Sequence, residues 1–203
     1  ILNANRNAFL QGLCQTVILT VFAIVLASIW GILLGVMGVS QLPWIRAIST
    51  TIIYLFRGLP LMVLAFFIYI GLPGVIGTKI PAFTAGLLTL ILNEGAYTAA
   101  FVRGGFEAVD HGQMEAARSL GLPYSKSMRR VIMPQGLKIM IPSFINQFII
   151  TLKDTSILSA IGILELTQTG SLIVSRNSQG FRVWAIVAVI YLIDRKSTRL
   201  NSS

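Results

Sequence analysis

Residues 115–134 read EAARSLGLPYSKSMRRVIMP, a polar and basic segment within an otherwise apolar sequence. Residues 115–120 favour a helix, and Gly121 follows where a helix needs a left-handed C-terminal residue. Pro123 suits the first turn of a second helix, and Pro134 is expected to end that helix. The segment therefore predicts two short helices joined at a glycine, forming a compact protrusion.

The composition is that of a membrane protein. The 203 residues are 55% hydrophobic and 11% charged, with a mean hydropathy of +0.79, which is too apolar for a soluble domain. The net charge of +9 could favour nucleic acid, but the basic residues lie mainly beside apolar segments without interleaved aromatic residues. We therefore interpret the positive charge as a signal of membrane orientation and expect no nucleic-acid partner.

Apolar segments long enough to be helical recur along the chain. Because about 20 residues cross the hydrocarbon core of a bilayer, we predict an all-α membrane protein with about five transmembrane helices. Gly31 and Gly35 form a GxxxG pair in the first span, which predicts close approach of another helix. The first four predicted spans are residues 17–39, 57–70, 82–102 and 137–154, and an earlier start near Thr51 is the alternative for the second. A fifth predicted span begins between residues 181 and 184 and stops at residue 193.

The C-terminal segment departs from this pattern. Only 11 uncharged residues separate Arg182 from Asp194, too few to cross a bilayer. We therefore expect residues 194–203 to be a non-native tail, following a membrane domain over residues 8–193. The chain begins at Ile1, so we also expect its natural start to lie upstream.

Polar residues near the middle of two spans are candidate functional residues. Asn93 and Glu94 lie in the third span, and an ionisable residue at that depth is costly unless it faces protein or water. Glu94 could line a translocation cavity, pair with a cation on another helix, or lie nearer an interface. Asn146 and Gln147 in the fourth span could contact a substrate or form helix–helix hydrogen bonds. These four residues are the candidate substrate path.

The polar segment resembles the EAA loop of ABC importer permeases, a cytoplasmic two-helix coupling loop expected here over residues 107–135. The resemblance is carried by Glu-Ala-Ala, a glycine after three intervening residues, and a Val-x-Met-Pro ending in place of Ile-x-Leu-Pro. It implies that this loop docks into the ATP-hydrolysing subunit; the alternative is a solvated hairpin. The expected coupling residues are Glu115, Ala116, Ala117, Gly121 and Pro134.

Other segments resemble permeases for polar amino acids. Residues 57–60 (RGLP) are similar to an R-G-T-P segment of that group; the alternative is an interfacial arginine that reaches the headgroups, followed by a helix-starting proline. Residues 95–104 are similar to G-A-Y-x-x-E-x-x-R-G, with Ala100 in the glutamate position. Residues 153–156 and 162–167 resemble segments of glutamine-type permeases. The resemblance covers about residues 8–193 and implies a type I ABC importer transmembrane fold.

The resemblance implies a permease subunit that moves a polar L-amino acid, of the glutamine or glutamate class, by alternating access. Its implied partners are an ATPase subunit dimer, a second permease subunit as homo- or heterodimer, and an extracytoplasmic amino-acid-binding protein. No G-x-x-x-x-G-K-[ST] motif occurs, so ATP and Mg are expected on the partner ATPase, with no cofactor in this chain. We expect no enzymatic role and no metal site, and His111 is interpreted as a solvated loop residue.

The charge distribution predicts an orientation. With the loop inside, eight basic residues fall on inner segments and five on outer ones, leaving out the tail. This favours an outside N-terminus with the loop and the C-terminus inside. The resemblance implies a bacterial protein, so the chain is expected in the inner membrane with the loop and C-terminus in the cytoplasm.

Two other functional classes stay open. The chain could be an ATP-independent channel or secondary transporter for a small polar solute, although no internal repeat supports this. A structural membrane scaffold is the third possibility.

Overall fold

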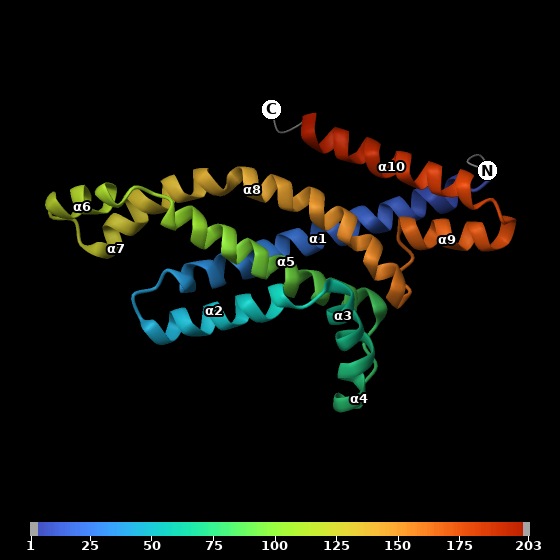
Figure 1. Ribbon diagram of the computed structural model, residues 1–203, viewed down its shortest axis with the longest axis horizontal. Coiled ribbons are helices and arrows are strands. Elements are labelled where there is room, and N and C mark those ends of the chain that lie inside the picture. The colour runs from blue at the N-terminus through green and yellow to red at the C-terminus, as the bar shows by residue number, and fades with distance from the viewer. Residues whose placement is uncertain (1–3, 201–203) are drawn as a thin grey trace. The chain divides into compact units, whose positions relative to one another are not determined.

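The computed structural model describes residues 4–200, with side chains from residue 4 to residue 193 (Figure 1). Its regular secondary structure in this part of the chain is helical. The elements in order are α1 (Arg6–Gly38), α2 (Pro43–Gly58), α3 (Leu61–Phe66), the π-helix η1 (Phe67–Gly71), α4 (Leu72–Ile76), α5 (Ala82–Glu107), α6 (His111–Ser119), α7 (Tyr124–Ser127), the π-helix η2 (Met128–Ile132), α8 (Met133–Asp154), the 3₁₀-helix η3 (Thr155–Ile161), α9 (Leu166–Asn177) and α10 (Gly180–Leu200).

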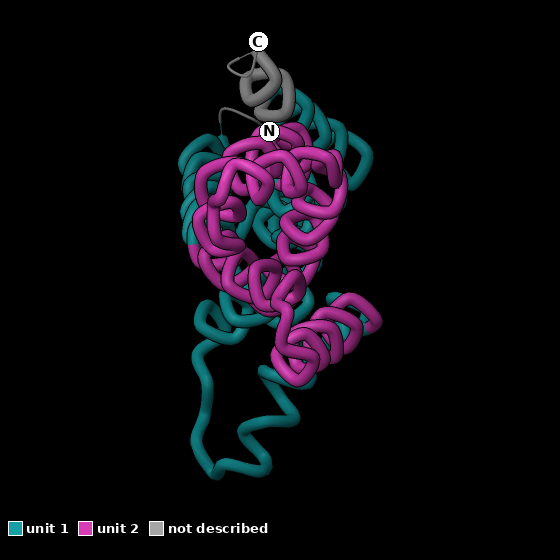
Figure 2. The backbone as a smooth tube through the Cα atoms, turned by 90° about the vertical axis from the view of Figure 1, so that its left-hand side faces the viewer, with its two compact units in different colours: residues 1–25, 59–91, 148–203 teal, residues 26–58, 92–147 magenta. Residues whose placement is uncertain are grey.

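The chain divides into two compact units, coloured separately in Figure 2. The first unit contains residues 1–25, 59–91 and 148–203, and the second contains residues 26–58 and 92–147. Three of the long helices, α1, α5 and α8, contribute residues to both units. Each unit is described by itself below.

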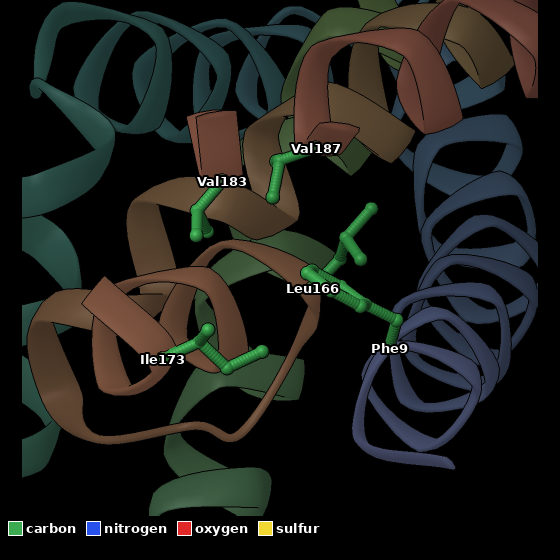
Figure 3. Close-up of a cluster of buried hydrophobic side chains, with 5 residues drawn as sticks. All are labelled: Phe9, Leu166, Ile173, Val183 and Val187. Atoms are coloured by element: carbon green, nitrogen blue, oxygen red, sulfur yellow. The ribbon is translucent and has the colours of Figure 1, made fainter. Parts of the chain in front are cut away.

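The first unit has an apolar core where the start of α1 meets α9 and α10. Figure 3 shows this cluster, in which Phe9 lies beside Leu166 and the side chains from α9 and α10 complete the contact. Every member is at most 4% exposed. The members are Phe9, Leu166, Ile173, Val183 and Val187.

A buried carboxylate organises the start of α9 in the same unit. Glu165 is fully buried and accepts hydrogen bonds from the backbone N–H groups of Thr167 (2.8 Å) and Gln168 (2.7 Å). It therefore serves as the N-cap of α9, satisfying donors that the first turn leaves unpaired. The hydroxyl of Tyr191 on α10 donates to the same carboxylate at 3.0 Å, which ties α10 to the α9 cap.

The second unit is built on a close contact between α1 and α5. A Cβ added at Gly31 would lie 2.5 Å from Thr98 Cβ, and one added at Gly35 would lie 2.5 Å from Val102 Cβ. Only glycine allows the two backbones to approach this closely, so the close approach predicted for the GxxxG pair is confirmed. On the α2 side, Ser49 Oγ donates to the carbonyl of Leu34 at 2.6 Å.

The predicted all-α membrane fold is confirmed, and the first and third predicted spans correspond to α1 and α5. By length and composition, these two helices in the described residues could cross a membrane, and four spans result if each of two interrupted helix pairs counts as one. The fourth predicted span lies within α8. The apolar part of α10, Gly180–Ile193, is shorter than a span. The predicted non-native tail at residues 194–203 lies outside the residues whose side chains are described.

The prediction that the second span begins at Arg57 is wrong. Helix α2 ends at Gly58, and a new helix begins after Pro60, whose carbonyl accepts from Leu64 N at 3.1 Å. Proline has no N–H for the preceding turn and restricts the residue before it, so a helix breaks at this point. Arg57 consequently lies at the end of α2 and does not begin the next helix.

Candidate functional site

The first helix of the predicted loop is α6, which has defined caps at both ends. Asp110 is its N-cap and accepts from Gly112 N at 2.7 Å. At the other end Gly121 has φ +82°, its N–H donates to Arg118 O, and Leu122 N donates to Ala117 O. These two bonds define a Schellman motif, which confirms the left-handed residue predicted at Gly121.

The second helix of the loop begins as predicted and ends differently. Pro123 is the N-cap of α7, but Pro134 does not end the helix; the prediction that it would is wrong. The backbone widens to the π-helix η2, where Met133 N donates to Met128 O. Because the backbone is widened at this turn, the helix does not need a hydrogen bond from Pro134, which has no N–H. The helix therefore continues into α8. The loop and the fourth span are thus one continuous helical element.

Figure 1 shows α6 and α7 as a hairpin at the start of α8. The hairpin is joined to α8 by Gln135, whose side-chain amide donates to Gln113 Oε1 on α6 at 3.3 Å. The same amide also donates to Val131 O at 3.0 Å. Ser127 is fully buried and its hydroxyl donates to Pro123 O at 3.3 Å. These bonds hold the two helices of the hairpin together at the start of α8.

The expected coupling residues differ in exposure. Glu115 and Ala116 are exposed on α6, whereas Ala117 is buried against the rest of the hairpin. Gly121 and Pro134 are exposed. The hairpin thus exposes Glu115 and the small residue Ala116 on a surface that also carries exposed basic side chains, among them Arg118 and Lys126.

A cavity of about 240 Å³ lies between the hairpin and the end of α5. His111, predicted to be a solvated loop residue, is an exposed side chain at the first position of α6 and contributes to the wall. The lining residues are Val39, Phe106, Glu107, Val109, Asp110, His111, Met114, Tyr124, Met128 and Ile132.

The predicted path residues fall into three situations. Gln147 and Glu94 are 7% and 1% exposed, and the Gln147 amide donates to the Glu94 carboxylate. Asn93 is 5% exposed, and its Nδ2 donates to Phe56 O at 3.0 Å. Asn146, the neighbour of Gln147 in α8, is exposed. The structure thus brings Glu94 and Gln147 together and directs Asn93 to the α2 backbone.

The bond from Asn93 has a specific chemical basis. In a continuous helix, Phe56 O would accept from the N–H of residue 60, which is a proline here. The side-chain amide of Asn93 supplies a donor to this carbonyl, so the break after α2 does not leave it unpaired.

Sequence interpretation did not single out Gln113 and Gln135, which join the hairpin to α8. They lie 22 positions apart, and no local spacing pattern marks a pair of amides at that separation. No group of three or more His, Cys, Asp or Glu side chains capable of holding a metal occurs among the described residues.

The described part of the chain thus combines apolar helices with a hydrogen-bonded polar hairpin. The sequence matches the family of binding-protein-dependent transport system inner membrane components over residues 27–194. Because this match covers most of the chain, the chain belongs to that family and is a permease component of an ABC transporter.

Curated relatives of the chain are amino-acid permeases. It is 34% identical over 193 residues to the probable glutamine ABC transporter permease protein GlnM of Bacillus subtilis (strain 168), covering 95% of this chain and 89% of the relative. It is 40% identical over 152 residues to the glutamine transport system permease protein GlnP of Escherichia coli (strain K12), covering 74% of this chain and 69% of the relative.

Solved structures share the fold. A chain of an amino acid ABC transporter crystallised with histidines has a TM-score of 0.92 and 37% identity, covering 98% of this chain and 92% of that one. A chain of the MetNI methionine ABC transporter in an inward-facing conformation has a TM-score of 0.78 at 17% identity, covering 97% of this chain and 95% of that one. The second likeness concerns the fold alone.

Proposed function

We propose that this chain is the permease subunit of an ATP-driven importer for a polar L-amino acid, of the glutamine or glutamate class. Relatives at 34% and 40% identity are named as glutamine permeases. The observation that carries the proposal is the capped hairpin α6–α7, which exposes Glu115 and Ala116 and continues through η2 into α8.

The hairpin is the proposed contact with an ATPase subunit. Its two helices are joined at the Schellman motif of Gly121, and Gln113 is hydrogen-bonded to Gln135 at the start of α8. Because α7, η2 and α8 follow one another without a loop, displacement of the hairpin would move α8 with it. ATP and Mg would bind the ATPase dimer, and alternating access would follow from this movement.

The proposed substrate path involves the polar residues of α5 and α8. Glu94 and Gln147 form a polar pair within otherwise apolar helices, where such groups often mark a transport route. Asn146 is exposed and thus has a side chain available to a second permease subunit or to a substrate. A second permease subunit and an extracytoplasmic binding protein complete the proposed assembly.

We propose that the chain lies in a bacterial inner membrane with its N-terminus outside and with the hairpin and C-terminus in the cytoplasm. Arg57 lies 11 positions beyond Arg46 in α2, about 16 Å along the helix axis. If α2 enters the bilayer from its Arg46 end, Arg57 lies within the bilayer and not at the inner surface. Removing Arg57 from the inner group leaves seven basic residues against five, which keeps the predicted orientation.

Reconstitution tests the proposal. The full chain would be placed in liposomes with its ATPase and binding protein, and uptake of radiolabelled L-glutamine would be measured with ATP or with a non-hydrolysable analogue. The proposal predicts uptake that requires both ATP and the binding protein. Uptake that persists without ATP would instead identify a channel or secondary transporter, and no uptake of any amino acid would contradict the assignment.

A further inference from the structure

The second unit contains a pocket between α2 and α5 that the proposed path residues do not line. Its volume is about 230 Å³, or roughly eight times the 30 Å³ that a water molecule occupies in the liquid. This is smaller than sites for drug-sized ligands and is suited to a molecule the size of an amino acid. Its polar lining residues include Thr50, Tyr54, Arg57, Arg103 and Glu107.

The charges in this pocket do not balance. Arg103 Nε donates to Glu107 Oε1 at 2.8 Å, so that carboxylate is already engaged by one guanidinium. Among the described residues, no carboxylate forms an ion pair with Arg57. The lining residues therefore carry one positive charge in excess, located at Arg57.

The guanidinium of Arg57 is held in place by an aromatic ring. Its Cζ lies 5.0 Å from the centroid of the Tyr97 ring on α5, within the range of a cation–π contact. This contact leaves the planar edge of the guanidinium, which binds carboxylates with two parallel hydrogen bonds, available to a ligand. Arg57 is also exposed. It lies in α2, which could form one half of an interrupted membrane span. A charge within a span must face protein or water.

We infer that Arg57 binds the carboxylate of an amino-acid substrate in this pocket. The inference rests on the proposed function and adds a specific recognition contact to it. One excess positive charge matches one α-carboxylate, and the hydroxyls of Thr50 and Tyr54 are additional polar groups in the same lining.

Ala100 keeps the pocket open to such a ligand. It lies in the same lining as Arg57 and Arg103. A glutamate there would place a protein carboxylate among the two guanidiniums and would occupy the space. The small side chain of Ala100 leaves both the space and the charge of Arg57 to a ligand.

Direct binding tests the inference. The full chain, assembled with its ATPase in phosphatidylcholine nanodiscs, would be titrated with L-glutamine and with 4-aminobutanamide, which is glutamine without its carboxylate. We expect saturable binding of glutamine and at least tenfold weaker binding of 4-aminobutanamide, because a hydrogen bond to a charged group contributes about 1.5–3 kcal/mol.

Variants locate the site. Arg57→Gln should weaken glutamine binding at least tenfold, whereas Arg46→Gln, on the same helix but outside the lining, should leave it unchanged. Ala100→Glu should bind glutamine at least tenfold more weakly than the similarly sized Ala100→Gln, since only the glutamate competes for Arg57. Equal affinities in native and Arg57→Gln proteins, equal binding of the two ligands, or no glutamine binding by the native complex would overturn the inference.

A lipid headgroup is the other source of an anion. Mass spectrometry of the complex in phosphatidylglycerol nanodiscs would show whether Arg57→Gln loses bound lipid. Lipid loss with unchanged glutamine binding would assign the pocket to a headgroup and overturn the inference. ATP-dependent uptake by the native protein is measured separately, so failure of this site and failure of the importer assignment are distinguishable.

Discussion

The side-chain amide of Asn93 donates a 3.0 Å hydrogen bond to the carbonyl of Phe56. This is the carbonyl that Pro60 cannot serve, because proline lacks an N–H. A residue of α5 thus stabilises the interrupted end of α2.

Replacing this amide tests its structural role. Asn93→Leu removes the donor and should lower the free energy of unfolding by about 1–3 kcal/mol, because it leaves a helical carbonyl without that partner. Asn146→Leu is the matched control, since Asn146 is an exposed asparagine on α8, and it should change stability by less than about 0.5 kcal/mol. Thermal unfolding in detergent measures both. Equal losses in the two variants would refute the role given to Asn93.

The buried pair Glu94 and Gln147 provides a second test. Gln147→Leu removes the amide that donates to the Glu94 carboxylate and should destabilise the protein by about 1–3 kcal/mol. Gln147→Glu would place two carboxyl groups together and should be at least as damaging at neutral pH. Denaturation of the purified variants checks the order. A stable Gln147→Leu protein with normal uptake would show that neither folding nor transport depends on this bond.

The contact between α1 and α5 should not tolerate bulk at its glycines. Gly31→Val puts side-chain atoms where Thr98 and the Gly95 carbonyl already lie, and overpacking of this kind costs about 1–3 kcal/mol. Val36→Leu, at a side chain that is 41% exposed on α1, is the control and should be nearly neutral. Yield and melting temperature in the same detergent report the difference. A neutral Gly31→Val variant would mean that the helices do not pack as described.

The left-handed residue between α6 and α7 predicts a local effect. Gly121→Ala forces a Cβ into a backbone conformation with φ +82° and should cost about 1–2 kcal/mol. Gly74→Ala is the control, because an added Cβ meets nothing within 4 Å and no positive φ is involved, so it should be neutral or slightly stabilising. Hydrogen exchange should show the loss confined to residues 111–127. Unchanged protection there would contradict the Schellman geometry.

The sequence predicts the helices and the local turn chemistry because those depend on short-range patterns. The apolar segments of α1 and α5, Gly121 and the Gly31–Gly35 pair act through their own backbone or periodicity, and their predictions are confirmed. Whether a helix ends at a given proline is harder to predict from the sequence. Pro60 ends a helix and Pro134 does not, because Pro134 is preceded by the π turn at η2.

The candidate site was only partly predictable for a related reason. Glu94 and Gln147 were expected from their polarity within apolar segments, but polarity alone could not pair them or separate Gln147 from its neighbour Asn146. The direction of a side chain around a helix depends on tertiary packing. The pocket at Arg57 likewise needs α2 and α5 side by side, which no local pattern specifies.

Association with an ATPase tests the central claim most directly. The tagged chain would be purified from its native membrane in mild detergent, and bound proteins would be identified by mass spectrometry. We predict recovery of a P-loop ATPase, its loss with Glu115→Lys at the exposed face of α6, and its retention with Gln179→Lys, which adds the same residue at an exposed position outside the hairpin. Membrane insertion should be normal in all three proteins. Absence of any ATPase from the native preparation, or undiminished recovery with Glu115→Lys, would contradict the account.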